Sequence, residues 1–403
     1  MTSRALLVLA ASTYQLRTIR TAKRLGYRVV TTDNVATNPG HALADRSYSV
    51  DTTDLEGVLA IAKQEGIHGV IAPCTDVAVP TAAYVAEKLR LRGPPYESAL
   101  IVCNKQRFRR FLAKHGFPSP EAFDIEDSHP LPAGCFERGR WIMKPAQSSG
   151  AKGVFIVESA TQFEARLEQT LSCSPDRQGV LERFIGGTQG TCEGILERGR
   201  IAHAFFLDRQ TVASPYAATC GHHVPSLLDV DSQTALVETL ERLWRLLGVT
   251  DGPFDCDFVV GDDRVYILEM TPRLGGNSIS TLLHAASGGF DLVEYAVRHA
   301  LAEDMPLPAE IPLSPTALVI LGASASGRLA FNQQELDALA REPWVDSVGI
   351  DYEAGTPIGA FINGRHRVGE ALVRGKDRAN VDEHVRELRA RLDIRATDAT
   401  ASE

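Results

Sequence analysis

The first hundred residues alternate short apolar runs with helical stretches, and this alternation limits the possible folds more than any other feature. Strand–helix alternation of this kind is typical of a parallel, Rossmann-like sheet. The apolar runs lie at 4–10, 27–33 and 68–74, and the helical patterns lie at 13–26, 55–66 and 78–91. The turn after the first run reads AASTY and holds no glycine, which disfavours a nicotinamide dinucleotide on this domain.

Two proline-rich stretches divide the rest of the chain. RGPPYES at 92–98 ends the alternating pattern, and EDMPLPAEIPLSP at 303–315 is a connector. We predict a mixed α/β and α+β chain with an N-terminal α/β domain at 1–98 and a central domain at 99–305. A small β-rich α+β domain at 306–395 and a disordered tail at 396–403 would follow.

Periodicity and capping residues predict the elements of the two later domains. Ser159 is the expected N-cap of one helix, and another helix should end at Gly116. Expected helices lie at 104–116, 160–171, 231–248, 278–302 and 378–392; expected strands lie at 140–146, 153–158, 179–187, 316–323, 344–351 and 359–375; expected hairpins lie at 191–208, turning at ERGR, and at 254–270.

Charge and cysteine usage exclude several classes of protein. The net charge is −9 with no basic block, which argues against nucleic acid as the main partner. No apolar run reaches the roughly 20 residues of a membrane span, and we see no signal peptide. The seven cysteines are scattered without a C-x-x-C pair, which disfavours a disulfide framework or a zinc site. We therefore expect a reduced, cytoplasmic protein.

The hairpin that ends in EMTPRLGGN holds a candidate metal site. A turn centred near Asp263 places Asp257 opposite Glu269, and period-two alternation puts Asp255 and Thr271 on the same face. Opposed like charges repel, so two such carboxylates indicate a cation between them, and a few oxygen ligands beside a phosphate favour Mg²⁺. The alternative is a solvated sheet face on which both acids lie in water.

A second cluster, WIMKPAQSSGAKGV, combines a lysine with a loop of serines and glycines. Lys144 follows an apolar run, and the loop at 148–153 can turn several backbone N–H groups toward a phosphate. The alternative is a flexible surface turn with an exposed lysine. Since the chain holds neither a Walker A motif nor the protein-kinase motifs, any nucleotide site must be of another type.

In this order, Lys105, Lys144 with its loop, VLERFIGG, the acid-faced hairpin and RLGGN resemble the ATP-grasp superfamily over about residues 4–305. The N-terminal region is similar to the domain that precedes ATP-grasp in carboxylate–amine ligases. TCGHHVPSLL, PRLGGNSIS and the small β-rich region from about 312 look most like the L-amino acid ligases, which make dipeptides or related amides.

The resemblance implies a role for each matching residue. Lys105 and Lys144 would contact ATP phosphates, and Arg273 would steady the transferring phosphate. Three positions depart from the pattern: Thr271 stands where the family usually has Asn, Gln189 where it often has Glu, and Thr219 where similar ligases have Glu. The implied sets are catalytic Arg273, Lys144, Gly276 and Asn277; nucleotide-binding Lys105, Lys144, Ser148, Ser149, Gly150, Gly153, Glu182, Phe184, Ile185 and Gln189; metal-binding Asp257, Glu269 and Thr271; and substrate-binding His222, His223 and Arg273.

For some of these residues a purely structural role stays open. Glu182 could be an acid on an edge strand, and the two histidines could be surface or structural residues. The resemblance implies an ATP-dependent carboxylate–amine ligase that uses ATP and Mg²⁺, with Mn²⁺ as an alternative, and that forms an amide through an acyl-phosphate. Small-molecule substrates and a homodimer are the implied partners. The rivals are an ATP-grasp carboxylase or purine-type ligase, and a nucleotide-binding regulatory protein without turnover.

Overall fold

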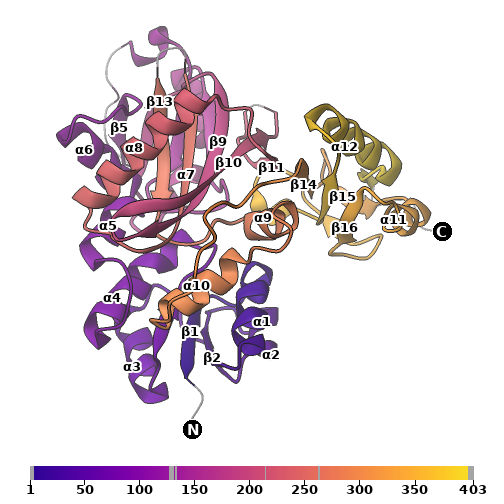
Figure 1. Ribbon diagram of the computed structural model, residues 1–403. Helices are drawn as coiled ribbons and strands as arrows, with labels where there is room; N and C mark the ends of the chain where they lie inside the picture. The colour runs from indigo at the N-terminus through magenta and orange to yellow at the C-terminus, as the bar shows by residue number, and fades with distance from the viewer. Residues whose placement is uncertain (1–3, 127–130, 132–133, 214, 262–263, 398–403) are drawn as a thin grey trace.

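The computed structural model places the described residues in four sheets flanked by helices (Figure 1). The description covers residues 4–126, 131, 134–213, 215–261 and 264–397. The N-terminal domain lies beneath the largest sheet, and the C-terminal segment with helices α11 and α12 lies at one side of it (Figure 1).

The N-terminal domain is the predicted Rossmann-like layer. Its parallel sheet has the strand order β3-β2-β1-β4, and every residue of the central strand β1 is buried. Because helix α1 precedes Gly26, whose φ of +85° suits glycine, the chain can turn directly into β2. The elements are β1 Ala5–Leu9, α1 Leu16–Arg24, β2 Arg28–Thr32, α2 Pro39–Leu43, β3 Arg46–Tyr48, α3 Leu55–Glu65, β4 Gly69–Ile71, α4 Val79–Leu89 and α5 Tyr96–Val102.

A small antiparallel sheet follows, with the strand order β5-β8-β6-β7. Ser159 caps α7 as predicted, since its side chain accepts a hydrogen bond from the backbone N–H of Gln162. Asn104 caps α6 in the same way through Arg107, which fixes Lys105 as the first helical residue. The elements are α6 Lys105–Lys114, β5 Ala122–Ile125, β6 Trp141–Pro145, β7 Phe155–Val157, α7 Ala160–Leu171 and β8 Gly179–Arg183.

The largest sheet has eight antiparallel strands in the order β13-β12-β9-β10-β11-β14-β18-β16. The hairpin predicted to turn at ERGR is confirmed, because Glu197 pairs with Arg200. The strands are β9 Thr188–Glu197, β10 Arg200–Thr211, β11 Thr219–Val224, β12 Gly252–Val260, β13 Val265–Thr271, β14 Thr316–Leu321, β16 Val345–Ile350 and β18 Gly369–Arg374. The last three come from beyond the proline-rich connector, so the sheet runs across that connector without a break.

Several segments differ from the pattern seen in the sequence. Of the strand expected at 359–375, only 369–374 is a strand, and Gly364–His366 forms a short 3-10 helix instead. The helical stretch expected at 278–302 is two helices, α9 Ile279–Ala286 and α10 Leu292–Ala300. Gly288 and Gly289 interrupt it with φ angles of +71° and +122°, which a helix cannot contain. Strand β19 Arg395–Thr397 takes in the first two residues of the expected disordered tail; residues 398–403 lie outside the described part.

Helices α8, α11 and α12 complete the fold. They span Val230–Leu246, Gln333–Leu339 and Arg378–Leu392, and two short strands, β15 Gly327–Ala330 and β17 Pro357–Ile358, form a small sheet with β19. Helix α10 returns to the N-terminal domain, where Arg24 of α1 contacts Glu294 with a nitrogen–oxygen distance of 3.0 Å. None of the helices in the described residues is both long and apolar enough to cross a membrane.

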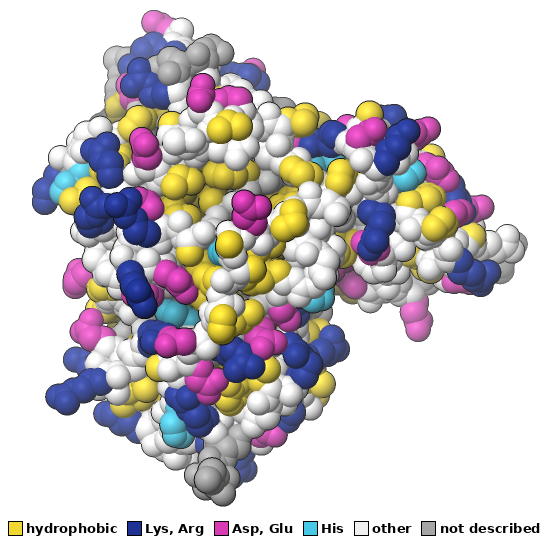
Figure 2. Space-filling view, viewed as in Figure 1, with side chains coloured by type: hydrophobic (Ala, Val, Ile, Leu, Met, Phe, Trp, Pro, Cys, Tyr) yellow, Lys and Arg dark blue, Asp and Glu magenta, His cyan; other side chains and the backbone are white. Residues whose placement is uncertain are grey.

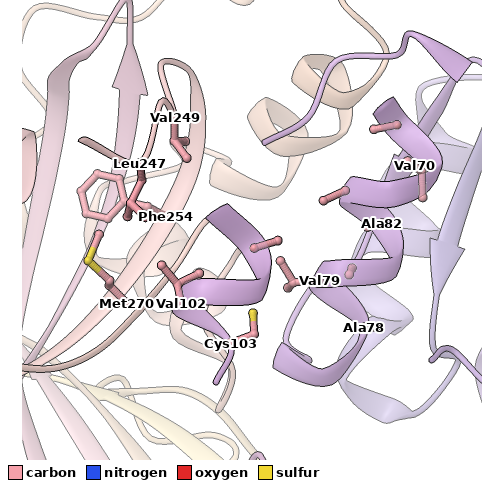
Figure 3. Packing of buried hydrophobic residues seen from close by; sticks show 14 of the residues in the cluster. Val70, Ala78, Val79, Ala82, Val102, Cys103, Leu247, Val249, Phe254 and Met270 are labelled. Carbon is pink, nitrogen blue, oxygen red and sulfur yellow. The ribbon is translucent and has the colours of Figure 1, made fainter. Parts of the chain in front are cut away.

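One hydrophobic cluster joins the N-terminal domain to the back of the large sheet. Figure 3 shows Val79 and Ala82 of α4 facing Val102 and Cys103, with Phe254 of β12 farther along. This contiguous packing holds the turn after β4 against the strand ends of the hairpin β12–β13. On the face shown in Figure 2, acidic and basic side chains are interspersed without a block of one sign.

Candidate active site

A cavity of about 1070 Å³ lies between the N-terminal domain, the small sheet, the large sheet and the C-terminal segment. Its walls include the turns at 10–15 and 74–76, the loop at 148–152, one face of the large sheet and residues 351–367. A volume of this size exceeds the usual range for a drug-sized ligand and can hold a nucleotide together with a second molecule.

Most of the residues singled out from the sequence line this cavity. They are Lys105, Lys144, Ser148, Ser149, Gly150, Glu182, Phe184, Ile185, Gln189, His222, Asp257, Glu269, Arg273, Gly276 and Asn277. Gly153, Thr271 and His223 do not line it. Residues spread from 105 to 277 in the sequence therefore line the same cavity. The structure shows this arrangement and not the role of each residue.

The hairpin β12–β13 has the register expected near its carboxylates. Asp257 pairs with Glu269, and Asp255 pairs with Thr271. The register then shifts by one between Asp257 and Phe258, so a bulge separates the carboxylate pair from the turn. Asp263, the expected centre of the turn, lies outside the described residues. Because both acids line a cavity, the open, solvated sheet face is not what the structure shows.

Each carboxylate of the pair contacts a cation in this structure. Arg209 Nη1 lies 2.6 Å from Asp257 Oδ2, and Lys105 Nζ lies 3.2 Å from Glu269 Oε1. Thr191 Oγ1 also donates to Asp257 Oδ1 at 2.7 Å. Burial by itself would raise the pKa of Asp257, but Arg209 and Thr191 bring it below the ordinary value.

The same face offers the oxygen donors that a hard cation requires. Asp257 and Glu269 supply two carboxylates, while Thr271 Oγ1 and Asp255 Oδ1 are buried without a hydrogen-bond partner. Mg²⁺ is bound by oxygen atoms and commonly takes few protein carboxylates together with phosphate oxygens and water. The carboxylate oxygens of this set fit Mg²⁺, whereas the side chain of Thr271 is fully buried and does not line the cavity.

Lys144 is buried inside a network of opposite charges. Its Nζ donates to Glu182 Oε2 at 2.7 Å, and Arg109 Nε donates to Glu182 Oε1 at 2.8 Å. Burial lowers the pKa of Lys144, an effect that Glu182 opposes. Burial would raise the pKa of Glu182, but Arg109 and Lys144 lower it to about 2. The exposed surface lysine is therefore excluded for Lys144.

Glu182 lies on β8, which is an interior strand of the small sheet, so it is not an edge-strand acid. Its carboxylate pairs with two cations, Arg109 and Lys144, and so is not free to bind a nucleobase. The backbone N–H of Phe184 donates to Arg140 O at 3.0 Å. The carboxylate of Glu182 and the backbone N–H of Phe184 therefore both have partners within the protein.

The loop at 148–153 turns on three residues with left-handed backbone. Gly150, Ala151 and Gly153 have φ angles of +68°, +56° and +69°. Gly153 packs inward, because a Cβ there would lie 3.0 Å from Cys173 Cβ, and its carbonyl accepts a bond from Thr170. This anchor explains why Gly153 leaves the cavity wall to Ser148, Ser149 and Gly150.

Arg273 ties the hairpin to the N-terminal domain. Its Nε donates to Asp76 Oδ1 at 2.9 Å, and its Nη1 donates to Asp255 Oδ2 at 2.7 Å. Next to it, the backbone N–H of Gly275 donates to both carboxylate oxygens of Glu193, at 2.9 and 3.0 Å. A Cβ at Gly275 would lie 2.3 Å from Glu193 Oε2, so glycine is required here by a close approach.

The two histidines face opposite sides of β11. His222 is 1% exposed, lines the cavity, and has no hydrogen-bond partner on either ring nitrogen. Burial, with a smaller effect from Arg209, lowers the pKa of His222 to about 3, so the ring is neutral near pH 7. His223 instead points to α12, where its Nε2 lies 3.1 Å from Asp382 Oδ1, and it does not line the cavity.

Sequence reasoning missed several charged residues that shape the cavity: Asp76, Arg109, Lys152, Glu193, Arg209 and Arg365. Arg109 could have been found, because it lies one helical turn after Lys105. Glu193 interrupts an apolar stretch of β9, and a lone charge in a buried strand usually has a partner. Arg209 follows Asp208 after the apolar run of β10 and gives no such signal. Asp76, Lys152 and Arg365 carry no comparable local signal.

Known proteins with this arrangement can now be compared. Residues 102–277 match the ATP-grasp domain family. The formate-dependent phosphoribosylglycinamide formyltransferase of Burkholderia thailandensis is 26% identical over 380 residues, covering 90% of this chain and 87% of that protein. The L-amino acid ligase from Bacillus licheniformis has a TM-score of 0.83 at 19% identity and covers 99% of both chains. The phosphoribosylglycinamide synthetase from Anaerococcus prevotii has a TM-score of 0.76 at 19% identity, covering 98% of this chain and 100% of that one.

The cavity lies between two antiparallel sheets, the small sheet and the large sheet. Residues 102–277, which supply much of the cavity wall, match the ATP-grasp domain family, and the fold of the whole chain is similar to that of the L-amino acid ligase from Bacillus licheniformis.

Proposed function

We propose that the chain is an ATP- and Mg²⁺-dependent carboxylate–amine ligase, which joins a carboxylic acid to an amine through an acyl-phosphate and releases ADP and phosphate, with an amino acid as one of the two substrates. The observation that carries the proposal is the convergence of Lys105, Lys144, the loop at 148–150 and the pair Asp257–Glu269 on one cavity. Two cations, a glycine loop and a carboxylate pair suit the β- and γ-phosphates, where a kinase-like first step takes place.

The chemistry needs no protein nucleophile. A carboxylate oxygen of the acid attacks the γ-phosphorus and ADP leaves; the amine nitrogen then attacks the acyl carbon, phosphate leaves, and the nitrogen gives up a proton. Lys105 and Lys144 hold the phosphates, and backbone N–H groups at 148–150 and 276–277 approach the transferring group. Mg²⁺ held by Asp257 and Glu269 would offset the charge that develops between the β- and γ-phosphates. Arg273 can assist by sharing its guanidinium between Asp255 and the phosphate.

The products and an isotope label test this route. With the acid labelled by oxygen-18 in its carboxylate, one labelled oxygen should appear in the released phosphate, because the acyl C–O bond breaks when the amine attacks. With hydroxylamine as the amine, a hydroxamate should form only when ATP and Mg²⁺ are present. Release of AMP and pyrophosphate, or phosphate free of the label, would refute the acyl-phosphate.

A second candidate acid is formate. It is favoured by the relative from Burkholderia thailandensis, which is a formate-dependent phosphoribosylglycinamide formyltransferase and which this chain matches over 87% of its length. The amine that such a reaction uses would then be an amine of the purine route rather than an amino acid. Including formate in the hydroxamate assay separates the two candidates.

We further propose that the chain is a cytoplasmic homodimer, on the resemblance to carboxylate–amine ligases. Leu227 and Val230 are exposed by 71% and 74% near the start of α8 and could be covered in a dimer. Light scattering should give twice the chain mass of 43.7 kDa. A mass of one chain at micromolar concentration would contradict the dimer.

A further inference from the structure

The carboxylates that line the cavity already have hydrogen-bond donors within the protein. Among the described lining residues, every carboxylate already accepts from a cation or from backbone N–H groups. These carboxylates are Asp33, Asp76, Glu182, Asp255, Asp257, Glu269 and Asp351. Two of them, Asp257 and Glu269, are the proposed metal ligands. Asp255 keeps one buried oxygen, Oδ1, without a partner, but it lies on β12; the described part of the wall formed by β10 and β11 holds no partner-free carboxylate for an ammonium group of a substrate.

One wall, formed by the strands β10 and β11, is distinct from the phosphate-binding loop. Arg209 pairs across the strands with His222, and Thr211 pairs with Thr219, so these side chains share one face. Arg209 Nε donates to Thr219 Oγ1 at 2.9 Å, while Arg209 Nη1 reaches Asp257. The guanidinium of Arg209 therefore lies next to Asp257, one of the two proposed metal ligands, where the substrate acid would react.

The rest of this wall is uncharged. Val212, Tyr216 and Ala217 line the cavity next to the two threonines, and Tyr216 packs on Phe155 with ring centroids 6.1 Å apart. His222 is the buried polar group aimed into the space, since both of its ring nitrogens lack partners. An imidazole, two hydroxyls and one guanidinium can bind an oxygen-bearing or apolar tail, but a desolvated ammonium beside Arg209 would be repelled.

We propose that the wall formed by Arg209, Thr211, Thr219 and His222 selects a carboxylic acid that carries no α-ammonium group. The inference rests on the proposed function and deepens it: the acid is a simple, hydroxy or keto acid, and the amino acid of the reaction enters as the amine. The bonds that form and break are those of the acyl-phosphate route, with no further co-reactant.

Pairs of acids that differ only in the α-ammonium test the inference on the full-length enzyme. Suitable pairs are acetate and glycine, propionate and L-alanine, 3-methylbutanoate and L-valine, and 3-phenylpropanoate and L-phenylalanine, each with hydroxylamine, ATP and Mg²⁺. In the pairs that react, hydroxamate formation from the acid without ammonium should be faster by about tenfold or more, the usual weight of one charged hydrogen bond. A preference for the amino acid of each pair would overturn the inference and leave the ligase function intact.

A matched pair of variants shows whether this wall is the cause. Thr219→Glu adds a carboxylate beside Arg209, and Thr219→Gln adds the same shape without charge. The glutamate variant should shift the preference toward the amino acid by about tenfold relative to the glutamine variant. Equal preferences in the two variants would overturn the assignment to this wall. If no acid of either kind yields ADP with the wild-type enzyme, the proposed ligase function itself fails, and the inference fails with it.

Discussion

Glu269→Gln should lower kcat/KM by on the order of a thousandfold, because the loss of one metal-binding carboxylate removes several kcal/mol of charge stabilisation. The change keeps the shape of the side chain and removes its charge, so the pairing of β12 with β13 should survive. Phosphate release, measured over a range of Mg²⁺ concentrations, is the readout. The Mg²⁺ concentration at half-maximal rate should rise, and excess Mg²⁺ should restore part of the activity if the main loss is metal affinity.

A competing explanation for such a loss is the contact between Lys105 Nζ and Glu269 Oε1. If Glu269 only positions Lys105, the substitution should raise KM for ATP and leave the Mg²⁺ dependence unchanged. Glu238→Gln, an exposed site on α8, is the matched control and should leave both quantities at their wild-type values. Unchanged turnover of Glu269→Gln at ordinary Mg²⁺ would remove Glu269 from the metal site altogether.

The pairing of Asp257 with Glu269 could be predicted because a short turn joins the two strands. The period of two in a strand and the position of a turn are local properties, so they fix which residues oppose each other within a few positions. The bulge next to Asp257 was not foreseen, yet it lies beyond the carboxylates and leaves their pairing intact. Local patterning therefore sufficed for the centre of the candidate site.

Contacts between segments far apart in the chain could not be predicted in the same way. Asp76 and Arg273 are separated by 197 positions, and they meet because a hydrophobic cluster packs the N-terminal domain behind the hairpin. Likewise, no periodicity indicates that β14 pairs with β11. Such pairings follow from the arrangement of whole elements, which one sequence does not specify locally.

The two histidines show what strand alternation cannot predict, even within a single strand. Alternation alone implies that His222 and His223 face opposite sides, but it does not say which side holds the cavity. The structure turns His222 inward and places His223 against Asp382 of α12, a residue much farther along the chain. Of the two histidines predicted to bind substrate, only His222 therefore lines the cavity, and the C-terminal helix α12 lies on the other face of β11.

Lys144→Met should weaken nucleotide binding by about 10- to 100-fold, the usual weight of a charge-assisted contact in a dry site. Calorimetric titration with ADP or a non-hydrolysable ATP analogue measures the effect, and KM for the acceptor amine should change little. Lys114→Met, an exposed lysine at the end of α6, provides the control and should bind nucleotide as the wild type does.

The variant also removes one of the two cations that neutralise buried Glu182, so it should lower the free energy of unfolding. Burial would then raise the pKa of Glu182 with only Arg109 to oppose it. The double variant Lys144→Met with Glu182→Gln separates the two effects, since it removes the lysine and the buried carboxylate together. Its stability to denaturant should recover toward wild type while nucleotide affinity stays low. If affinity recovers together with stability, Lys144 supports the fold around Glu182 and does not itself contact the phosphates.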